Sequence, residues 1–124
     1  MSKKREILVK AKELIATPEQ WTKGHFGRDA EGNQVDLDSD ACVGRCLMGA
    51  VYRAQRILTN EAEPEERFGY SVAVRDAVVQ LNECLPADAV EGQWANIPEF
   101  NDYQSTTHAD VIAVIDCALE KTQE

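Results

Sequence analysis

The chain has 124 residues, 44% of them hydrophobic and 28% charged, and 22 acidic against 13 basic side chains give it a net charge of −9. A chain of this size buries roughly two-thirds of its unfolded surface, so it needs neither a metal nor a disulfide to fold. The acidic balance argues against a broad contact with nucleic-acid phosphates, which requires clustered Lys and Arg. We therefore expect a single helical domain over residues 1–124, with an acidic surface that serves solubility.

The sequence predicts neither a signal peptide nor a membrane span. Lys10, Lys12 and Glu13 interrupt the only early apolar run, and no stretch reaches the roughly 20 apolar residues of a membrane helix. The cysteines fall among apolar residues at helical spacing, which favours reduced thiols over disulfides. These are Cys42, Cys46, Cys84 and Cys117. We therefore expect a cytoplasmic protein with four reduced cysteines.

Apolar residues at helical spacing predict a first helix over about Lys3 to Ala16. The segment Thr17 to Gln20, with proline in second place, is a capping-box sequence, and Trp21 after it is a predicted core anchor. Glycine and asparagine then make a buried helix impossible up to Asp40. A small β-hairpin or a loop is expected there, with Phe26–Arg28 and Gln34–Asp36 as its arms.

Three more helices complete the predicted fold. The second begins at a cap on Asp38 or Ser39 and extends to Leu58, and a close helix crossing explains Gly49 within it. The third runs from Pro64 towards Pro86, and Gly69 is a possible point at which it divides into two pieces. We expect its apolar face, which includes Phe68 and Val72, to be buried. The last follows a capping pattern at Thr107 and Asp110.

The stretch from Pro86 to Thr106 shows no helical period, and Trp94, Ile97 and Phe100 are expected to pin it to the helices as a packed loop. The fold class that these elements predict is all-α, with about four helices in a compact bundle and a small hairpin or loop between the first two.

The sequence contains two patterns that resemble metal-binding sites. Cys42 and Cys46 are expected one helical turn apart on one face, but His25 and His108 could complete a zinc site only from afar. The run Asp36-x-Asp38-x-Asp40 lacks the glycine and the last carboxylate of a calcium loop, so it is interpreted as an acidic helix start. We expect no metal and no cofactor, and a zinc-binding module is the third hypothesis.

An enzyme is the second hypothesis. It is a small hydrolase or transferase in which Cys46 or Cys42 acts as nucleophile, with His108 as base and Asn101 or Asp102 as the group that orients it. No nucleophile elbow, phosphate-binding loop or dinucleotide motif supports it. The favoured hypothesis is a non-enzymatic interaction or regulatory module, a monomer or homodimer, whose partner is a protein or a small ligand.

Three short patches together resemble a family of small uncharacterised bacterial and phage proteins, a domain of unknown function. They are Trp21-x-x-Gly24, Cys46-x-x-Gly49-Ala50 and Asn101-Asp102. Typical members have Trp where Phe100 precedes the Asn-Asp pair, and often Trp where Arg45 precedes the cysteine. The resemblance implies a helical fold and no particular reaction. It marks positions that serve a site or the scaffold, and these are Trp21, Cys46, Gly49, Asn101 and Asp102.

Overall fold

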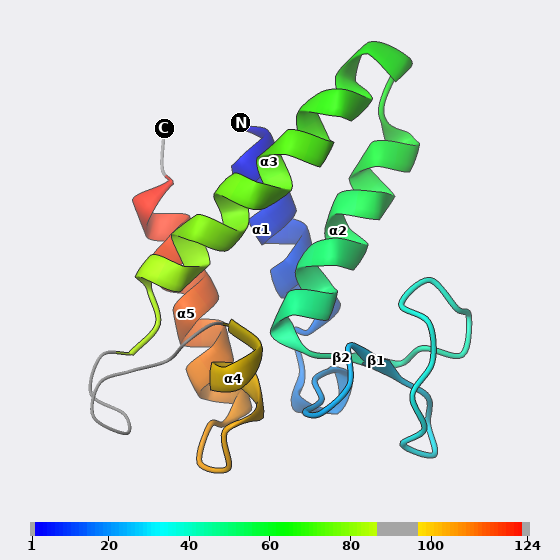
Figure 1. The fold of residues 1–124 in the computed structure, drawn as a ribbon, viewed down its shortest axis with the longest axis vertical. Helices are drawn as coiled ribbons and strands as arrows, with labels where there is room; N and C mark the ends of the chain where they lie inside the picture. Colours follow the sequence, from blue (N-terminus) through cyan, green and yellow to red (C-terminus); the bar gives the residue numbers. More distant parts are fainter. Residues whose placement is uncertain (1, 87–96, 123–124) are drawn as a thin grey trace.

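The computed structural model describes residues 2–86 and 97–122 (Figure 1). Within them the chain forms five α-helices, so the all-α prediction is confirmed and its number of helices is one too low. The additional helix, α4, lies in the stretch that was expected to be a loop. The helices are α1 (Lys3–Leu14), α2 (Leu47–Glu61), α3 (Pro64–Glu83), α4 (Ile97–Asp102) and α5 (His108–Lys121). A 3-10 turn, η1 (Pro18–Gln20), and two short antiparallel strands, β1 (Gly27–Arg28) and β2 (Gly44–Arg45), lie between α1 and α2.

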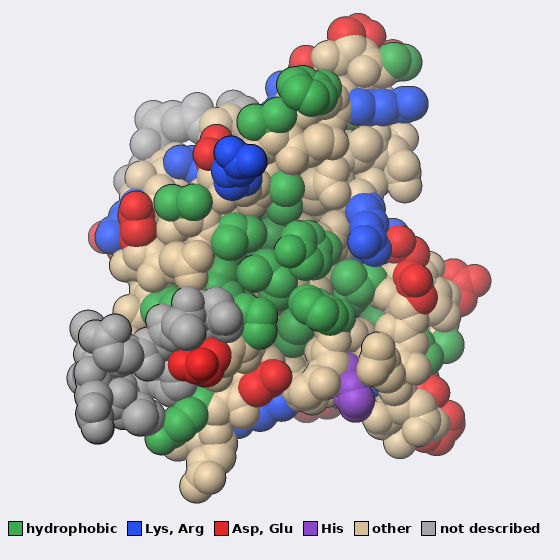
Figure 2. Space-filling model, in the orientation of Figure 1, with side chains coloured by type: hydrophobic (Ala, Val, Ile, Leu, Met, Phe, Trp, Pro, Cys, Tyr) green, Lys and Arg blue, Asp and Glu red, His purple; other side chains and the backbone are tan. Residues whose placement is uncertain are grey.

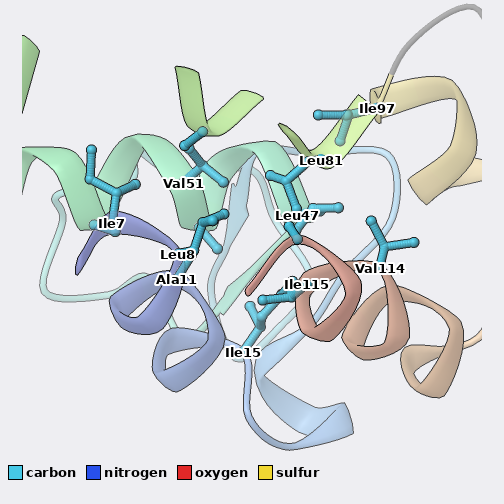
Figure 3. Packing of buried hydrophobic residues seen from close by; sticks show 14 of the residues in the cluster. Ile7, Leu8, Ala11, Ile15, Leu47, Val51, Leu81, Ile97, Val114 and Ile115 are labelled. Atoms are coloured by element: carbon cyan, nitrogen blue, oxygen red, sulfur yellow. The ribbon is translucent and has the colours of Figure 1, made fainter. Parts of the chain in front are cut away.

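The core lies where α1, α2, α3 and α5 meet (Figure 3). α2 and α3 form a helical hairpin, α1 packs against both, and α5 packs against α1 and α3. Figure 3 shows Ile7 and Leu8 of α1 beside Leu47 and Val51 of α2, and all four side chains are fully buried. The apolar stripes predicted for the first and last helices form the core, because burial of such stripes is what stabilises helices of this length. The stripe predicted for the second helix joins the core only from Leu47 onward, since Val43 lies before α2 and is 45% exposed.

The starts of α1, η1 and α5 follow the local sequence closely. The Ser2 hydroxyl accepts from the Arg5 amide at the start of α1. Both predicted capping boxes are present: the first starts η1 at Thr17, and the second starts α5, where Thr107 and Asp110 each accept the other's backbone amide. These caps satisfy amides that have no partner inside a helix.

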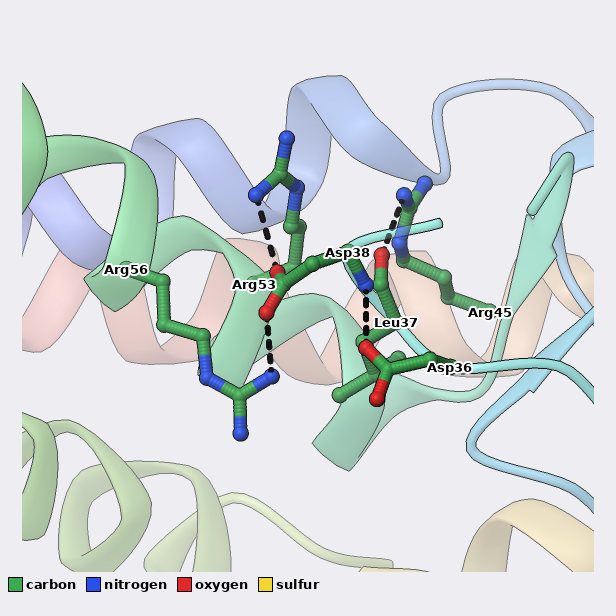
Figure 4. Close-up of polar contacts among 6 residues, drawn as sticks. All are labelled: Asp36, Leu37, Asp38, Arg45, Arg53 and Arg56. Carbon is green, nitrogen blue, oxygen red and sulfur yellow. Dashed lines mark hydrogen bonds and ion pairs between the residues drawn. The ribbon is translucent and has the colours of Figure 1, made fainter. Parts of the chain in front are cut away.

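The second helix begins at Leu47, so its predicted start at Asp38 or Ser39 is wrong. The acidic run folds into turns instead, in which Asp36 Oδ1 accepts from the Asp38 amide at 2.8 Å (Figure 4). The Asp38 carboxylate then binds the arginines of α2, Arg53 at 2.8 Å and Arg56 at 3.0 Å. These two ion pairs attach the acidic run to the side of α2. The run itself is not helical, because turn bonds of Asp compete with helix formation.

The predicted hairpin has a different partner strand. Gly27 and Arg28 pair with Arg45 and Gly44, whereas the expected arm Gln34–Asp36 contributes only an isolated bridge from Gln34 to Arg28. The tight turn between the arms is present, since Asp29 and Gly32 close it with a 3.1 Å backbone bond. Strand pairing over so few residues is decided by tertiary contacts.

α3 is one continuous helix through Gly69, and its buried face is not the predicted one. Tyr70, Ala73, Ala77 and Leu81 face the core. Phe68 and Val72, which were expected there, are 78% and 49% exposed. The sequence is ambiguous because this helix has apolar residues on two opposite faces.

Cys84 and Cys117 form a disulfide that links the end of α3 to α5, so the prediction of four reduced cysteines is wrong for this pair. Their Cα atoms are 5.9 Å apart, in the range that a disulfide requires. Cys42 and Cys46 are free and buried. The bridge joins residues 33 positions apart, and no local pattern indicates such a pairing.

Ile97 and Phe100 are buried, as predicted, and they lie on α4. Trp94, the third residue expected to pin this stretch, lies outside the described residues. None of the helices within residues 2–86 and 97–122 is long and apolar enough to cross a membrane.

Candidate functional site

The segment after η1 is fastened to β2 and α4. The Thr22 amide donates to the Arg45 carbonyl at 3.1 Å, and Trp21 forms a bridge with Arg45. The Trp21 indole N–H donates to Asn101 Oδ1 at 2.7 Å. Trp21 is thus the predicted anchor, and it acts through a hydrogen bond as well as through packing against the core.

Asn101 is fully buried, and its side chain joins three segments of the chain. Its Oδ1 accepts from Trp21 and from the amide of Leu47, the first residue of α2, at 3.0 Å. Its Nδ2 donates to the Thr22 carbonyl at 3.0 Å and to Asp102 Oδ1 at 2.9 Å. All four hydrogen-bonding positions of the amide are occupied, as burial of a polar group requires.

Asp102 is exposed and holds the loop that follows Trp21. Besides the bond from Asn101, its Oδ1 accepts from the Gly24 amide at 2.9 Å. Gly24 has a φ of 82°, a left-handed conformation that side chains disfavour. The Gly in the Trp-x-x-Gly patch and the Asp in the Asn-Asp patch are therefore direct partners.

Cys46 is the N-cap of α2, and its Sγ accepts from the Gly49 amide at 3.3 Å. A Cβ at Gly49 would collide with the backbone carbonyl of Phe26. The glycine therefore permits a close approach to the segment before β1 and not the expected helix crossing. Burial raises the pKa of the Cys46 thiol, and the nearby negative charge of Asp102 raises it further. The hydrogen bond from the Gly49 amide lowers this pKa, but burial has the larger effect.

These elements line an open cleft of about 250 Å³, which we name the Cys46 cleft. Cys46 and Asp102 line it, so it lies next to the hydrogen-bond network of Asn101. Three further lining residues, His25, Gln34 and Pro98, come from separate segments of the chain. In the sequence, His25 is a candidate only as a zinc ligand and Gln34 only as the start of a hairpin arm, and Pro98 carries no site pattern. No spacing pattern could have found them, because only the fold brings these segments together.

His108 lies elsewhere. Its Nε2 is 2.7 Å from the Ile15 carbonyl oxygen, and its ring centre is 6.2 Å from that of Trp21. Because a carbonyl only accepts, this contact requires the hydrogen of the imidazole to be on Nε2. His108 does not line the Cys46 cleft, and no hydrogen bond joins it to Cys46 or Cys42 among the described residues.

The two free thiols do not share a helix face. Cys42 lies in the turns before β2, and its Sγ donates to the Gly44 carbonyl at 3.5 Å. It lines a second cleft beside Arg28 and Arg45. In residues 2–86 and 97–122, no three His, Cys, Asp or Glu side chains are grouped so that they could hold a metal ion. The expectation that Cys42 and Cys46 are one helical turn apart is wrong, since α2 begins only after Cys46.

Comparison with known proteins identifies a family but no individual relative. No curated protein and no solved structure matches the chain. A family described as a family of unknown function matches residues 1–121, which include every residue of the network and the cleft. The match agrees with the resemblance to an uncharacterised domain noted in the sequence. The chain therefore belongs to the Family of unknown function (DUF6197).

Proposed function

We propose that this protein is a non-enzymatic binding module and that the Cys46 cleft holds its ligand, a small molecule. The observation that carries this proposal is the mixed lining of the cleft, where Asp102 and Gln34 lie beside the apolar ring of Pro98. Sites for small molecules combine a largely apolar concave wall with a few placed polar groups. A volume of about 250 Å³ suits a fragment-sized molecule better than a peptide.

The lining also indicates the class of ligand. An ionised carboxylate such as that of Asp102 only accepts hydrogen bonds, and the chain carries a net charge of −9. Both favour a ligand with donor groups or a positive charge. Phe26, which lines the cleft, is 47% exposed, and its ring centre is 6.2 Å from that of Tyr52. This aromatic pair offers a surface on which a flat or cationic group can stack. We therefore expect a small amine with a planar part.

The state of the thiol argues for binding over catalysis. A cysteine nucleophile acts as the thiolate, and the raised pKa of Cys46 keeps this thiol protonated at neutral pH. The alternative is a hydrolase or transferase that uses Cys46 or Cys42 with His108. In the Cys46 cleft such chemistry would have to use His25 as the base, because His25 lines this cleft and His108 does not.

The test uses tryptophan fluorescence, because the Trp21 indole is bonded to Asn101 at the edge of the cleft. The chain has two tryptophans, so a Trp94→Phe variant leaves Trp21 as the only reporter. We expect a planar amine such as benzamidine to change its emission saturably and to raise the unfolding temperature, whereas benzoate has no effect.

A matched pair of variants locates the effect. Asp102→Asn should abolish the response to the amine, and Asp40→Asn, which removes an exposed carboxylate outside the cleft, should preserve it. If neither benzamidine nor other small planar amines change the emission or the unfolding temperature, the proposal is wrong. Equal loss of the response in both variants would show non-specific charge attraction and would contradict it as well.

We also propose a single domain that acts in the cytoplasm of a bacterium or in phage-infected cells. Support comes from the resemblance in sequence to small bacterial and phage proteins. The argument from reduced cysteines no longer supports this location, since Cys84 and Cys117 are bonded. Disulfides in the cytosol are usually transient or redox-sensing, so the redox state of this pair in cells decides between the compartments.

A further inference from the structure

α3 has a second apolar face opposite the one that it buries. Tyr70, Ala73, Ala77 and Leu81 form the buried face. On the opposite face Phe68, Val72 and Val79 are 78%, 49% and 50% exposed. A helix with apolar residues on both sides is normally buried on both sides. Exposed apolar surface of this kind marks an interaction site.

The exposed residues follow the spacing of a coiled-coil seam. Phe68, Val72, Arg75, Val79 and Asn82 succeed one another at intervals of four and three residues, and all five are exposed. We name this row the α3 seam. Alternating steps of four and three keep a row of side chains on one face of a helix, facing a partner helix.

We infer that the α3 seam pairs with the α3 seam of a second copy of this chain, with the two helices antiparallel. The charges at the middle of the helix identify the partner and the direction. Arg75 and Asp76 are adjacent, and neither makes an ion pair or a side-chain hydrogen bond among the described residues. A parallel pair would set Arg75 against the partner's Arg75. An antiparallel pair centred here brings Arg75 near the partner's Asp76, twice, by symmetry.

The same centre matches the apolar residues. Val72 and Val79 are equally far along the helix from the point between Arg75 and Asp76. In the antiparallel pair, Val72 therefore meets the partner's Val79, and Val79 meets the partner's Val72. Phe68 meets the region of the partner's Asn82. The charges and the two valines therefore share one centre of symmetry, as an interface between identical copies requires.

The size of the face sets the expected strength. α3 has 20 residues, about 30 Å of helix, and Figure 2 shows further hydrophobic side chains gathered beside it, between α3 and α2. One pair of helices buries an area at the low end for specific complexes. We expect a dissociation constant on the order of tens of micromolar.

Sedimentation velocity of the full chain, with its disulfide intact, tests the inference over roughly 1 µM to 1 mM, a range that spans this constant. The expected result is a reversible shift from monomer to dimer. Val72→Asp should weaken the dimer at least about tenfold, because it places a carboxylate in the apolar seam. Val43→Asp, at an exposed valine outside α3, is the matched control and should change nothing.

A charge exchange tests the antiparallel geometry. Arg75→Asp alone gathers four carboxylates at the two-fold axis and should weaken the dimer about tenfold or more. The double variant Arg75→Asp/Asp76→Arg restores two charges of each sign and should recover the parent affinity. Because these residues are exposed, the variants should keep the parent far-UV circular dichroism.

A chain that stays monomeric up to about 1 mM refutes the inference, since an interface of this kind must form at that concentration. A dimer that survives Val72→Asp but dissociates with Val43→Asp assigns the interface to another face. Failure of the double variant to recover affinity refutes the antiparallel arrangement.

Discussion

Asn101→Ala should destabilise the fold far more than an ordinary exposed substitution. It removes four hydrogen bonds and leaves three groups without their partner, namely the Trp21 indole, the Leu47 amide and the Thr22 carbonyl. Leu47 is fully buried, so its unpaired amide costs about 1–3 kcal/mol. Trp21 and Thr22 are half-buried and can reach water, so each lost bond there costs about 1 kcal/mol. We expect a total loss of about 3–5 kcal/mol, including the cavity that remains.

Urea denaturation followed by far-UV circular dichroism measures this loss as a lower midpoint with an unchanged slope. Asn60→Ala is the matched control, because Asn60 is exposed on α2, and it should change stability by less than about 0.5 kcal/mol. A loss below about 1 kcal/mol for Asn101→Ala would refute the assignment of Asn101 as the cross-link between these segments.

Asn101→Asp adds a test in pH. The introduced carboxyl group can still accept hydrogen bonds from Trp21 and Leu47. It also faces Asp102 Oδ1, which in the parent accepts a hydrogen bond from the Asn101 amide group. Burial and this neighbouring charge raise the pKa of the introduced group in the folded state above its unfolded value of about 3.9. Its contribution is therefore most favourable below about pH 4 and is lost as the pH rises through the folded-state pKa. The deficit relative to the parent should be larger at pH 7 than at pH 4, and a deficit independent of pH would contradict the burial of this group.

Three further predictions concern glycine packing and the cysteines. Gly49→Ala should lower the free energy of unfolding by about 2 kcal/mol or more, because the new Cβ collides with backbone. Gly69→Ala should leave it unchanged or raise it by up to about 1 kcal/mol, because its Cβ meets only the flexible end of a lysine side chain. Equal urea midpoints for the two variants would contradict this prediction. Reduction of the Cys84–Cys117 bridge, which spans 33 residues, should cost up to about 4 kcal/mol, and Ellman titration of the unfolded, unreduced chain should count two thiols and not four. Native Cys46 should react with iodoacetamide far more slowly than a free thiol of pKa about 8.5, with a rate that rises above neutral pH, and rapid labelling at pH 7, located by peptide mapping, would restore the enzyme hypothesis.

Contacts within a few residues were predictable from the sequence. The capping boxes at Thr17 and Thr107 and the stripe of α1 depend on neighbours one to four positions away. The start of α2, which the sequence predicted at Asp38 or Ser39, shows where local patterns fail. Asp38 and Ser39 are good caps, but turn bonds of Asp36 and the ion pairs of Asp38 with α2 favour another conformation. Local propensity is a weak guide when tertiary contacts offer the same groups better partners.

The candidate site divides in the same way. The sequence marked Trp21, Asn101 and Asp102 but left open whether they belong together, and the bond between Trp21 and Asn101 spans 80 positions. His108 was paired with Cys46 because both residue types suit catalysis, yet the fold places His25 in that cleft. Residue type indicates what a side chain can do, whereas position relative to distant segments determines what it contacts.

The sequence by itself determined that the chain is helical and acidic, where its capping boxes lie and which stripes of α1, α2 and α5 are apolar, because these properties depend on composition and on near neighbours. Only the tertiary structure decided that β1 pairs with β2, that Cys84 is bonded to Cys117, that α3 buries Tyr70 and exposes Phe68, and that Asn101 joins three segments. Each of these outcomes requires segments far apart in the chain to meet. Which of them meet depends on the packing and hydrogen bonding of the whole fold, and no local pattern in the sequence records it.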